Sequence, residues 1–303
     1  MNQPVLQRMI TVICHGLMRK HAATSQRFAN ATLYTIDTET GVSLRSLWPH
    51  ICKLLSMGRK TGKTRVTQPL RVNGTSPLFI KTSTLDSIPS RVRATLGLKR
   101  RSGLYDWALE ELCNHAEAQT RTDLIPKLFG YGVIRQRGGL VNEIFLNYEN
   151  LAGWMDGYEW LRKNPSNVCR FAEAGLALIA QLNAKGIYHL DLWAGNMMLS
   201  DGDLENLKAI DLENCFIGEN RYTSETLGFQ FAFLYQHQLN EFITETIYDQ
   251  IVESQLAGWK AIQKDRFDLF YKHFKHHGAD RKERHLIPKT GHLMQLNADG
   301  RAG

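Results

Sequence analysis

The sequence predicts an α+β fold in which a small, strand-rich part precedes a larger helical part. Between residues 67 and 148, short apolar runs are separated by turn residues, which is typical of strands. After residue 150, apolar residues recur with a helical period, most clearly over residues 166–185 and beyond residue 225. We therefore expect an N-terminal extension over residues 1–60, a first lobe over 61–147, a second lobe over 148–285 and a flexible tail over 286–303.

Length and composition limit the class of protein. The 303 residues are 43% hydrophobic and 22% charged, which suits a globular chain, and no apolar run is long enough to predict a membrane-spanning helix. The apolar segment 9–18 is interrupted by His15, so we interpret it as a packed or membrane-surface segment rather than a signal peptide. Five cysteines without C-x-x-C spacing favour reduced thiols and a cytoplasmic location, with peripheral association at the inner membrane face left open.

Basic residues outnumber acidic ones by 37 to 30, which gives a formal net charge of +7. They gather in three clusters, at residues 59–65, 91–101 and 281–284. Such clusters favour anionic partners, namely nucleotide phosphates, phosphorylated sugars or an acidic membrane surface. A solvated surface is the alternative for each cluster. Nucleic acid is not an expected partner, because no aromatic-rich basic strand accompanies the charge.

The first lobe begins with a predicted hairpin. Residues 67–72 and 77–82 have the pattern of two strands, and Asn73-Gly74 between them is a strong turn signal. Alternation along the second strand places Lys81 on the face opposite Ile80. Residues 107–117 then favour a helix, and residues 125–132 and 140–148 favour two further strands.

A glycine- and lysine-containing stretch at residues 58–64 falls one residue short of a phosphate-binding P-loop motif. Met57 stands where the first glycine would have to be, and no apolar strand leads into the stretch. We therefore do not expect a P-loop here.

The strongest functional pattern is His-x-Asp-x-x-x-x-Asn at residues 189–196, followed at short range by Asp211. A predicted helix over residues 166–185 precedes it, and two short predicted strands joined by a turn through residues 200–203 follow it and end at Asp211. Phosphoryl transfer from ATP needs these residue types: Asp191 can accept the proton of a substrate hydroxyl, while Asn196 and Asp211 hold Mg²⁺ against the phosphates.

This arrangement resembles the catalytic loop and the metal-binding aspartate of the protein-kinase-like superfamily, over about residues 66–235. The resemblance implies a bilobal fold with ATP and Mg²⁺ as cofactors. Lys81 ends a Phe-Ile-Lys run similar to the V-A-I-K strand, so it is expected to contact the α- and β-phosphates. Its expected acidic partner on the next helix is Glu111, with Glu110 and Glu117 as alternatives. Residues 147–151 correspond to the hinge that offers backbone groups to adenine.

The predicted site residues follow from the motif and the resemblance together. The catalytic set is Asp191, Lys81, Glu111 and His189; the cofactor-binding set is Lys81, Glu149, Asn196 and Asp211; the metal ligands are Asn196 and Asp211. Glu213 is a further candidate ligand, because it lies two residues after Asp211.

Shorter patterns indicate a branch of the superfamily. Asp-Leu-Trp-x-Gly-Asn at residues 191–196 is similar to the loop of fructosamine kinases, and Asp-Leu-Glu at 211–213 is similar to the metal-site segment of lipopolysaccharide-core sugar kinases. Residues 125–130, with 138–141, resemble the YrbL-like bacterial family. The resemblance implies a bacterial small-molecule or lipopolysaccharide-type kinase that phosphorylates a hydroxyl of a sugar, a lipid-linked sugar or a lipopolysaccharide-core component.

Several departures keep two alternatives open. No G-x-G-x-x-G precedes Lys81, Leu212-Glu213 stands where Phe-Gly would follow the metal-binding aspartate, and no A-P-E follows. Leu190 and Trp193 occupy the loop positions where typical protein kinases carry Arg and Lys. A nucleotide-binding pseudokinase with a regulatory role and a protein Ser/Thr kinase are therefore the alternative interpretations.

The C-terminal third is expected to be helical. An apolar helical segment over residues 227–243 is the predicted core of the second lobe, with helices near 246–262 and 264–277. The last of these carries an aromatic stripe that we interpret as a packing surface, with contact to an anionic membrane as the alternative. Its members are Phe267, Phe270, Tyr271 and Phe274. The histidines between 273 and 292 lack metal-ligand spacing, so no metal site is expected there.

Overall fold

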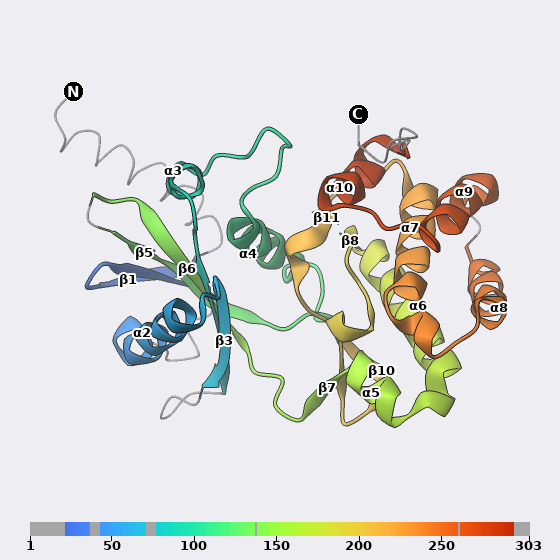
Figure 1. Ribbon diagram of the computed structural model, residues 1–303, viewed down its shortest axis with the longest axis horizontal. Coiled ribbons are helices and arrows are strands. Elements are labelled where there is room, and N and C mark those ends of the chain that lie inside the picture. The colour runs from blue at the N-terminus through green and yellow to red at the C-terminus, as the bar shows by residue number, and fades with distance from the viewer. Residues whose placement is uncertain (1–21, 37–42, 71–76, 137, 260, 294–303) are drawn as a thin grey trace. The chain divides into compact units, whose positions relative to one another are not determined.

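The computed structural model describes residues 22–36, 43–70, 77–136, 138–259 and 261–293 (Figure 1). The chain forms two compact units, one of residues 1–119 and 126–152 and the other of residues 120–125 and 153–303. The first is rich in strands and the second in helices, so the predicted α+β fold with two lobes is confirmed.

The first unit is built on one six-stranded sheet in which every neighbouring pair is antiparallel. The strand order is β1-β2-β5-β6-β4-β3. The strands are β1 (Thr24–Phe28), β2 (Ala31–Thr35), β3 (Arg65–Leu70), β4 (Leu78–Thr84), β5 (Leu128–Arg135) and β6 (Val141–Glu149). The predicted pair of strands is therefore present as β3 and β4, while the Asn73-Gly74 turn, with Arg71 and Val72, lies outside the described residues.

Helices cover both faces of this sheet, and each face has its own apolar core (Figure 1). Helix α2 (Leu44–Thr61) packs Leu47, Ile51 and Leu54 against Ile80 and Phe145 on one face. Helices α3 (Ile88–Leu96) and α4 (Trp107–Ala118) pack on the other face, where Tyr131 and Leu146 are buried. Alternation along β4 therefore decides which core each of its side chains enters.

The predicted N-terminal extension differs from what the structure shows. Strands β1 and β2 and all but the last residue of helix α2 lie within residues 1–60, yet the strands belong to the sheet and the helix packs on it. The stretch with P-loop-like spacing forms the last turn of α2, which ends at Gly62 with φ +68°. A phosphate-binding loop of this kind precedes a helix N-terminus, whereas this stretch lies at a helix C-terminus.

The main part of the second unit begins at Gly153 and is mostly helical. Its elements are β7 (Trp154–Asp156), α5 (Gly157–Lys163), α6 (Val168–Ala184), β8 (Ile187–His189), β9 (Met197–Ser200), β10 (Asp203–Ala209), β11 (Cys215–Ile217), α7 (Thr223–Gln236), α8 (Glu245–Leu256), α9 (Lys264–Phe274) and α10 (Arg281–Thr290). The strands form two small antiparallel sheets, β10-β9-β7 and β11-β8. The predicted helix before the catalytic pattern and the hairpin after it are both confirmed.

Helix α7 is the centre of the second unit, and α9 packs along it. The aromatic stripe of α9 is buried, with Phe274 edge-on to Phe229 at 5.0 Å and Phe267 edge-on to Phe231 at 5.7 Å between ring centroids. Burial inside the unit confirms the packing interpretation of the stripe and leaves it no apolar surface for a membrane. None of the helices in the described ranges combines the length and apolarity needed to cross a bilayer.

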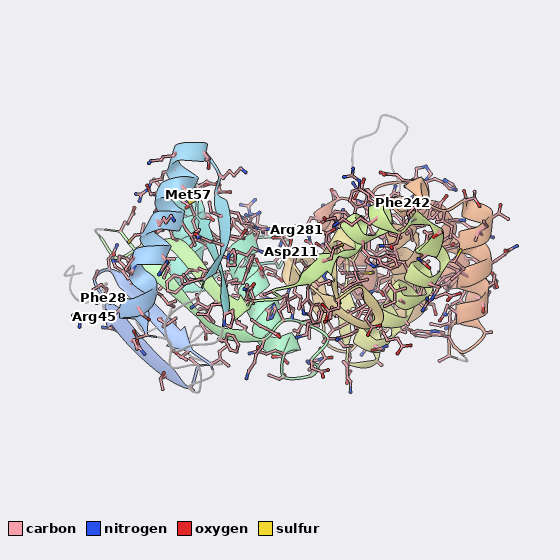
Figure 2. All side chains as sticks on the ribbon, turned by 90° about the horizontal axis from the view of Figure 1, so that it is seen from below. Phe28, Arg45, Met57, Asp211, Phe242 and Arg281 are labelled. Atoms are coloured by element: carbon pink, nitrogen blue, oxygen red, sulfur yellow. The ribbon has the colours of Figure 1, made fainter. Side chains whose placement is uncertain are left out.

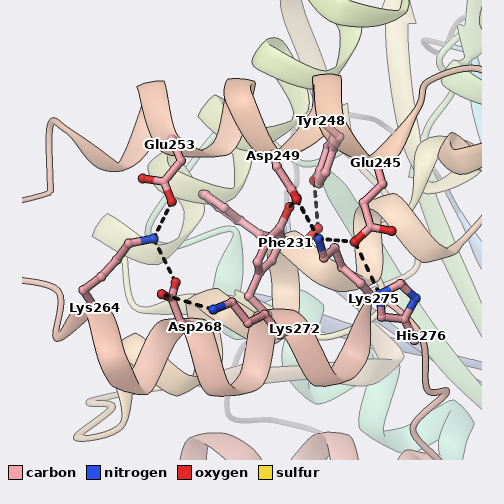
Figure 3. A network of polar contacts seen from close by, with 11 residues as sticks. Phe231, Glu245, Tyr248, Asp249, Glu253, Lys264, Asp268, Lys272, Lys275 and His276 are labelled. Carbon is pink, nitrogen blue, oxygen red and sulfur yellow. Dashed lines mark hydrogen bonds and ion pairs between the residues drawn. The ribbon is translucent and has the colours of Figure 1, made fainter.

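Ion pairs join α8 to α9 on the outside of this core (Figure 3). Lys264 bridges Glu253 at 2.6 Å and Asp268 at 2.8 Å. The buried ammonium of Lys275 contacts Glu245 at 2.6 Å and Asp249 at 2.7 Å. Helix α10 follows and extends to Thr290, five residues into the segment predicted as a flexible tail.

Candidate active site

The loop over residues 190–196 joins β8 to β9, and every second side chain in its first half is buried, which anchors its backbone. Leu190, Leu192 and Ala194 are almost fully buried, so the residues between them turn toward the surface of the second unit. The N–H of Leu190 donates to the carbonyl of Asn214 at 2.8 Å, which ties the start of the loop to the segment after Asp211. The sequence therefore folds locally so that Asp191 is presented while its neighbours anchor the backbone.

His189 holds this loop against the strand that leads to Asp211. Its Nε2 donates to the carbonyl of Ile210 at 3.0 Å, and its Nδ1 accepts from the N–H of Asp191 at 3.2 Å. Burial lowers the pKa of the ring, which fits the neutral form that these two bonds require. His189 was predicted as catalytic, but these contacts give it a positioning role, because both ring nitrogens bind backbone.

Among the described residues, one side chain contacts each carboxylate oxygen of Asp191. Asn214 Nδ2 donates to Oδ2 at 3.2 Å, and Arg284 Nη1 contacts Oδ1. The side chain keeps 23% of its surface exposed. A carboxylate oxygen can accept two hydrogen bonds, so each oxygen retains room for a hydroxyl donor. Asp191 is therefore oriented and accessible, as a proton acceptor must be.

Asn196 and Asp211 are brought to the same end of the β9–β10 hairpin. Ala209 pairs with Met197, and the N–H of Ile210 donates to the carbonyl of Asn196 at 3.0 Å. Asn196 Nδ2 donates to the carbonyl of Asp191 at 2.8 Å, so the oxygen of its amide is the atom that can coordinate a cation.

Asp211 adopts a left-handed backbone conformation, with φ +63° and ψ +61°. This conformation is uncommon for residues other than glycine, and functional sites are places where it persists. The following residues, Leu212–Asn214, form a short 3₁₀ turn. Carboxylate oxygens of Asp211 and Glu213 lie within 4.8 Å of each other, so the candidate ligand Glu213 is close to Asp211. Arg281 donates to the carbonyl of Glu213, two residues after Asp211, at 3.2 Å (Arg281 and Asp211 are labelled in Figure 2).

The first unit contains a buried ion pair between Lys81 and Glu111 at 2.6 Å. Lys81 is 7% exposed and Glu111 is 2% exposed, and the hydroxyl of Tyr148 donates to the same carboxylate at 3.0 Å. Glu111 is thus the acidic residue that pairs with Lys81, whereas Glu110 accepts from the N–H of Tyr105. The ring of His115 packs on that of Tyr148, with 4.7 Å between their centroids. Burial lowers the pKa of His115 to about 4, so it adds no charge at neutral pH.

The predicted hinge begins later than expected. Strand β6 continues to Glu149 between β5 and β4, and the N–H of Glu149 donates to the carbonyl of Lys127 at 2.7 Å. Its carboxylate accepts from the N–H of Lys127 at 3.1 Å. The predicted adenine contact at Glu149 therefore cannot use this N–H. The chain passes from the first unit to the second between Ala152 and Gly153, rather than after residue 147.

Sequence reasoning missed three residues that bind the loop. Arg284 and Asn214 hold Asp191, and Gln230 of α7 donates to the carbonyl of His189 at 3.2 Å. Arg284 was counted only as part of a basic cluster. Asn214 sits three residues after Asp211, and that closeness was the one available signal.

Basic residues from all three clusters make contacts inside their own units. Arg93 and Arg100 form ion pairs with the buried Asp106, and Arg284 pairs with Asp191. In the cluster at residues 59–65, Arg65 lies over the ring of Trp107, 4.5 Å from its centroid, whereas Arg59, Lys60 and Lys63 are all exposed.

Comparisons with known proteins give a coarse picture. No family model matches the sequence, and no curated protein sequence matches it. Solved structures do match, among them WaaP in complex with acyl carrier protein. That match has 16% sequence identity and a TM-score of 0.42, and it covers 70% of this chain and 80% of the other.

Proposed function

We propose that this protein is an ATP-dependent phosphotransferase that acts on a hydroxyl group of a small molecule. The observation that carries the proposal is the arrangement in the second unit. One continuous segment, from His189 to Asp211, presents an oriented carboxylate beside an amide oxygen and a second carboxylate. The buried Lys81–Glu111 pair of the first unit supports it, because an ammonium fixed by a carboxylate is suited to binding phosphate.

The residues at the hairpin end fit a magnesium ion. Mg²⁺ prefers oxygen ligands and in nucleotide sites is usually bound by one or two carboxylates together with phosphate oxygens. The amide oxygen of Asn196 and the carboxylate of Asp211 are such ligands, and Glu213 adds a second carboxylate close by. Bound MgATP would supply the phosphoryl group, and its Mg²⁺ would offset the negative charge of the phosphates.

Asp191 is the proposed acceptor of the proton that the substrate hydroxyl loses. As the acceptor hydroxyl oxygen bonds to phosphorus and the bond to the ADP oxygen breaks, an oxygen of the Asp191 carboxylate takes the hydroxyl proton. His189 and Asn214 keep the carboxylate in place during this step. The chain has a candidate base in Asp191, candidate metal ligands in Asn196 and Asp211, and the Lys81–Glu111 pair. The presence of all three favours catalysis over a pseudokinase that only binds nucleotide.

We infer that the acceptor is a sugar or lipopolysaccharide-core component. The support is the sequence of the loop and of residues 211–213, which resemble those of small-molecule and lipopolysaccharide-core sugar kinases. Trp193 stands at the loop position where a typical protein kinase carries a lysine, and its indole packs over Gly195. The absence of that lysine favours a small-molecule acceptor over a protein substrate.

The experiment is transfer of radiolabelled γ-phosphate from ATP to fractionated cell-envelope extract, with and without Mg²⁺. The proposal predicts labelling of a saccharide-containing fraction that requires Mg²⁺ and is absent with Asp191→Ala. Labelling of polypeptide alone would favour the protein-kinase alternative. Nucleotide binding without any labelled product would favour the pseudokinase.

We propose further that the protein associates peripherally with an anionic membrane surface through α2. Residues 43–65 contain no acidic residue. Lys53, Met57 and Lys60 are exposed and follow one another at helical spacing on the side away from the sheet. Figure 2 shows Arg45 beside Phe28 at one end of the helix and Met57 nearer the other. A basic face with an exposed apolar side chain is suited to lipid headgroups.

Sedimentation with vesicles containing phosphatidylglycerol tests this association. Lys53→Glu combined with Lys60→Glu should reduce the bound fraction several-fold, since each basic residue near an anionic surface contributes about 1 kcal/mol. Arg266→Glu, on exposed surface of α9, is the control and should change it little. Equal losses in both variants, or no binding by the unaltered protein, would show that the face is merely solvated.

A further inference from the structure

The C-terminal helix α10 reaches the loop that carries Asp191. Arg284 Nη1 contacts Asp191 Oδ1, and the two side chains keep only 16% and 23% of their surface exposed. The two residues are 93 positions apart in the chain. The contact is therefore a tertiary one, made possible by the docking of α10 in the second unit.

The guanidinium of Arg284 is held by more than its ion pair. Its Nε donates to the carbonyl of Ala279 at 3.0 Å, and its charge lies 4.5 Å from the ring centroid of Phe233 on α7. The planar guanidinium keeps further N–H donors beyond these contacts. These contacts restrain the Arg284 side chain, so it can hold the Asp191 carboxylate in one orientation.

Helix α10 is itself firmly placed. Asp280 caps its first turn by accepting from the N–H of Glu283 at 2.7 Å, and His285 and Ile287 are buried. Arg281, one turn before Arg284, donates to the carbonyl of Glu213. One helix thus contacts both the Asp191 loop and the turn that follows Asp211.

The loop has no positive charge of its own. Residues 189–196 contain no lysine or arginine, and Leu190 and Trp193 stand at the positions where the loops of protein kinases carry basic residues. A bare carboxylate beside the phosphates of ATP would repel them, and a cation on that carboxylate reduces the repulsion. Arg284 provides this charge from another part of the chain.

We propose that Arg284 is a positioning residue for Asp191, and that α10 is thereby a working part of the active site rather than a tail. Together with Asn214, Arg284 fixes both carboxylate oxygens while leaving each one an acceptor site for the substrate hydroxyl. The inference rests on the proposed phosphotransferase function.

Turnover measurements on a set of variants test this role. Arg284→Ala should lower kcat by about 10- to 100-fold, as expected when a reacting group is misplaced, and leave KM for ATP within a few-fold. Arg284→Lys should keep part of the rate. Added guanidinium should restore part of it in Arg284→Ala but none in Arg284→Ala combined with Asp191→Ala. Lys289→Ala, on exposed surface of the same helix, is the matched control and should leave kcat unchanged.

The outcomes separate this inference from the proposed function. If Asp191→Ala is inactive while Arg284→Ala is as active as Lys289→Ala, the function stands and the role of Arg284 is refuted. An increase of kcat in Arg284→Ala would also refute it, because Arg284 would then block the base. If Asp191→Ala turns over like the unaltered protein, or the unaltered protein transfers no phosphate, the function fails and the inference with it. Should Arg284→Ala fail to fold, the rate of Arg284→Lys decides: a kcat equal to that of the control would refute the role.

Discussion

The buried ion pair of the first unit allows a quantitative test of its role in the fold. Substituting Lys81→Met removes the ammonium but leaves the Glu111 carboxylate, which is only 2% exposed and accepts a hydrogen bond from the hydroxyl of Tyr148 at 3.0 Å. Breaking a buried pair from one side costs about 3–5 kcal/mol, because a charge is left in a poorly solvated place. We therefore expect Lys81→Met to lower the free energy of unfolding by that amount.

Removing both charges together should cost less than removing one. In Lys81→Met combined with Glu111→Gln, the amide can still accept from Tyr148, and no unbalanced charge remains. The expected loss is about 1 kcal/mol, close to that of one ordinary hydrogen bond. The coupling between the two sites should then be at least about 2 kcal/mol, well above the scatter of additive pairs.

Urea unfolding of the two single variants and the double variant measures these losses. With a urea slope near 2 kcal/mol/M, Lys81→Met should move the midpoint by roughly 1.5–2.5 M and the double variant by about 0.5 M. Hydrogen exchange of amides in β4 and α4 assigns the loss to the first unit. Additive losses in the double variant would refute the reasoning, because they would mean that the pair is well solvated. The same series shows whether lost activity in Lys81→Met reflects lost phosphate contact or lost fold.

Three further predictions concern packing, acid stability and the metal ligands. Gly228→Ala should lower the free energy of unfolding by about 1–3 kcal/mol, since a Cβ there would lie 2.4 Å from the carbonyl oxygen of Phe267, whereas Gly278→Ala, with nothing within 4 Å, should be nearly neutral in the same thermal melts. Burial alone would raise the pKa of Asp106, but hydrogen bonds from Arg93 and Arg100 hold this pKa below its usual value. The ion pairs therefore stabilise the fold fully above the ordinary carboxyl pKa, and this stabilisation is lost as the pH falls through the depressed pKa. Asp106→Asn should flatten this part of the curve of stability against pH in acid titrations. Asp211→Asn should weaken MgATP binding by roughly tenfold or more while leaving metal-free adenosine unaffected in calorimetry, and equal losses for both ligands would contradict the metal assignment.

The sequence predicted the parts of the site whose signals are local. Helical periodicity located α6, turn chemistry located the β9–β10 hairpin, and strand alternation placed Lys81 opposite Ile80. Each of these signals is carried by residues within one or two turns of one another, where the chain geometry alone decides which side chains share a face.

The contacts that could not be predicted are long-range. Arg284 reaches Asp191 across 93 positions, and nothing in the local pattern of α10 distinguishes it from a surface arginine. Strands β1 and β2 were also missed. The first is mostly exposed and polar, and all five residues of the second are buried, so neither shows the alternation that marks a half-buried strand.

Strand pairing sets the end of β6 and therefore the start of the predicted hinge. Apolar alternation ends near Tyr148, but Glu149 still pairs with Leu78 and donates to Lys127. Backbone hydrogen bonds with both neighbours, rather than side-chain pattern, set the end of β6 and hence the place where the chain leaves the first unit.

The single-turnover rate of phosphate transfer by Asp191→Ala, at saturating MgATP and with the acceptor fraction labelled by the unaltered protein, tests the central claim most directly. The contacts of Asp191 with Asn214 and Arg284 orient it for proton transfer, so the rate should fall by about 10²–10⁴-fold with the affinity for MgATP nearly unchanged. A rate equal to that of the unaltered protein would contradict the assignment of Asp191 as the base. A loss of nucleotide binding that accounts for the whole loss of rate would contradict it equally, because Asp191 would then be a structural residue.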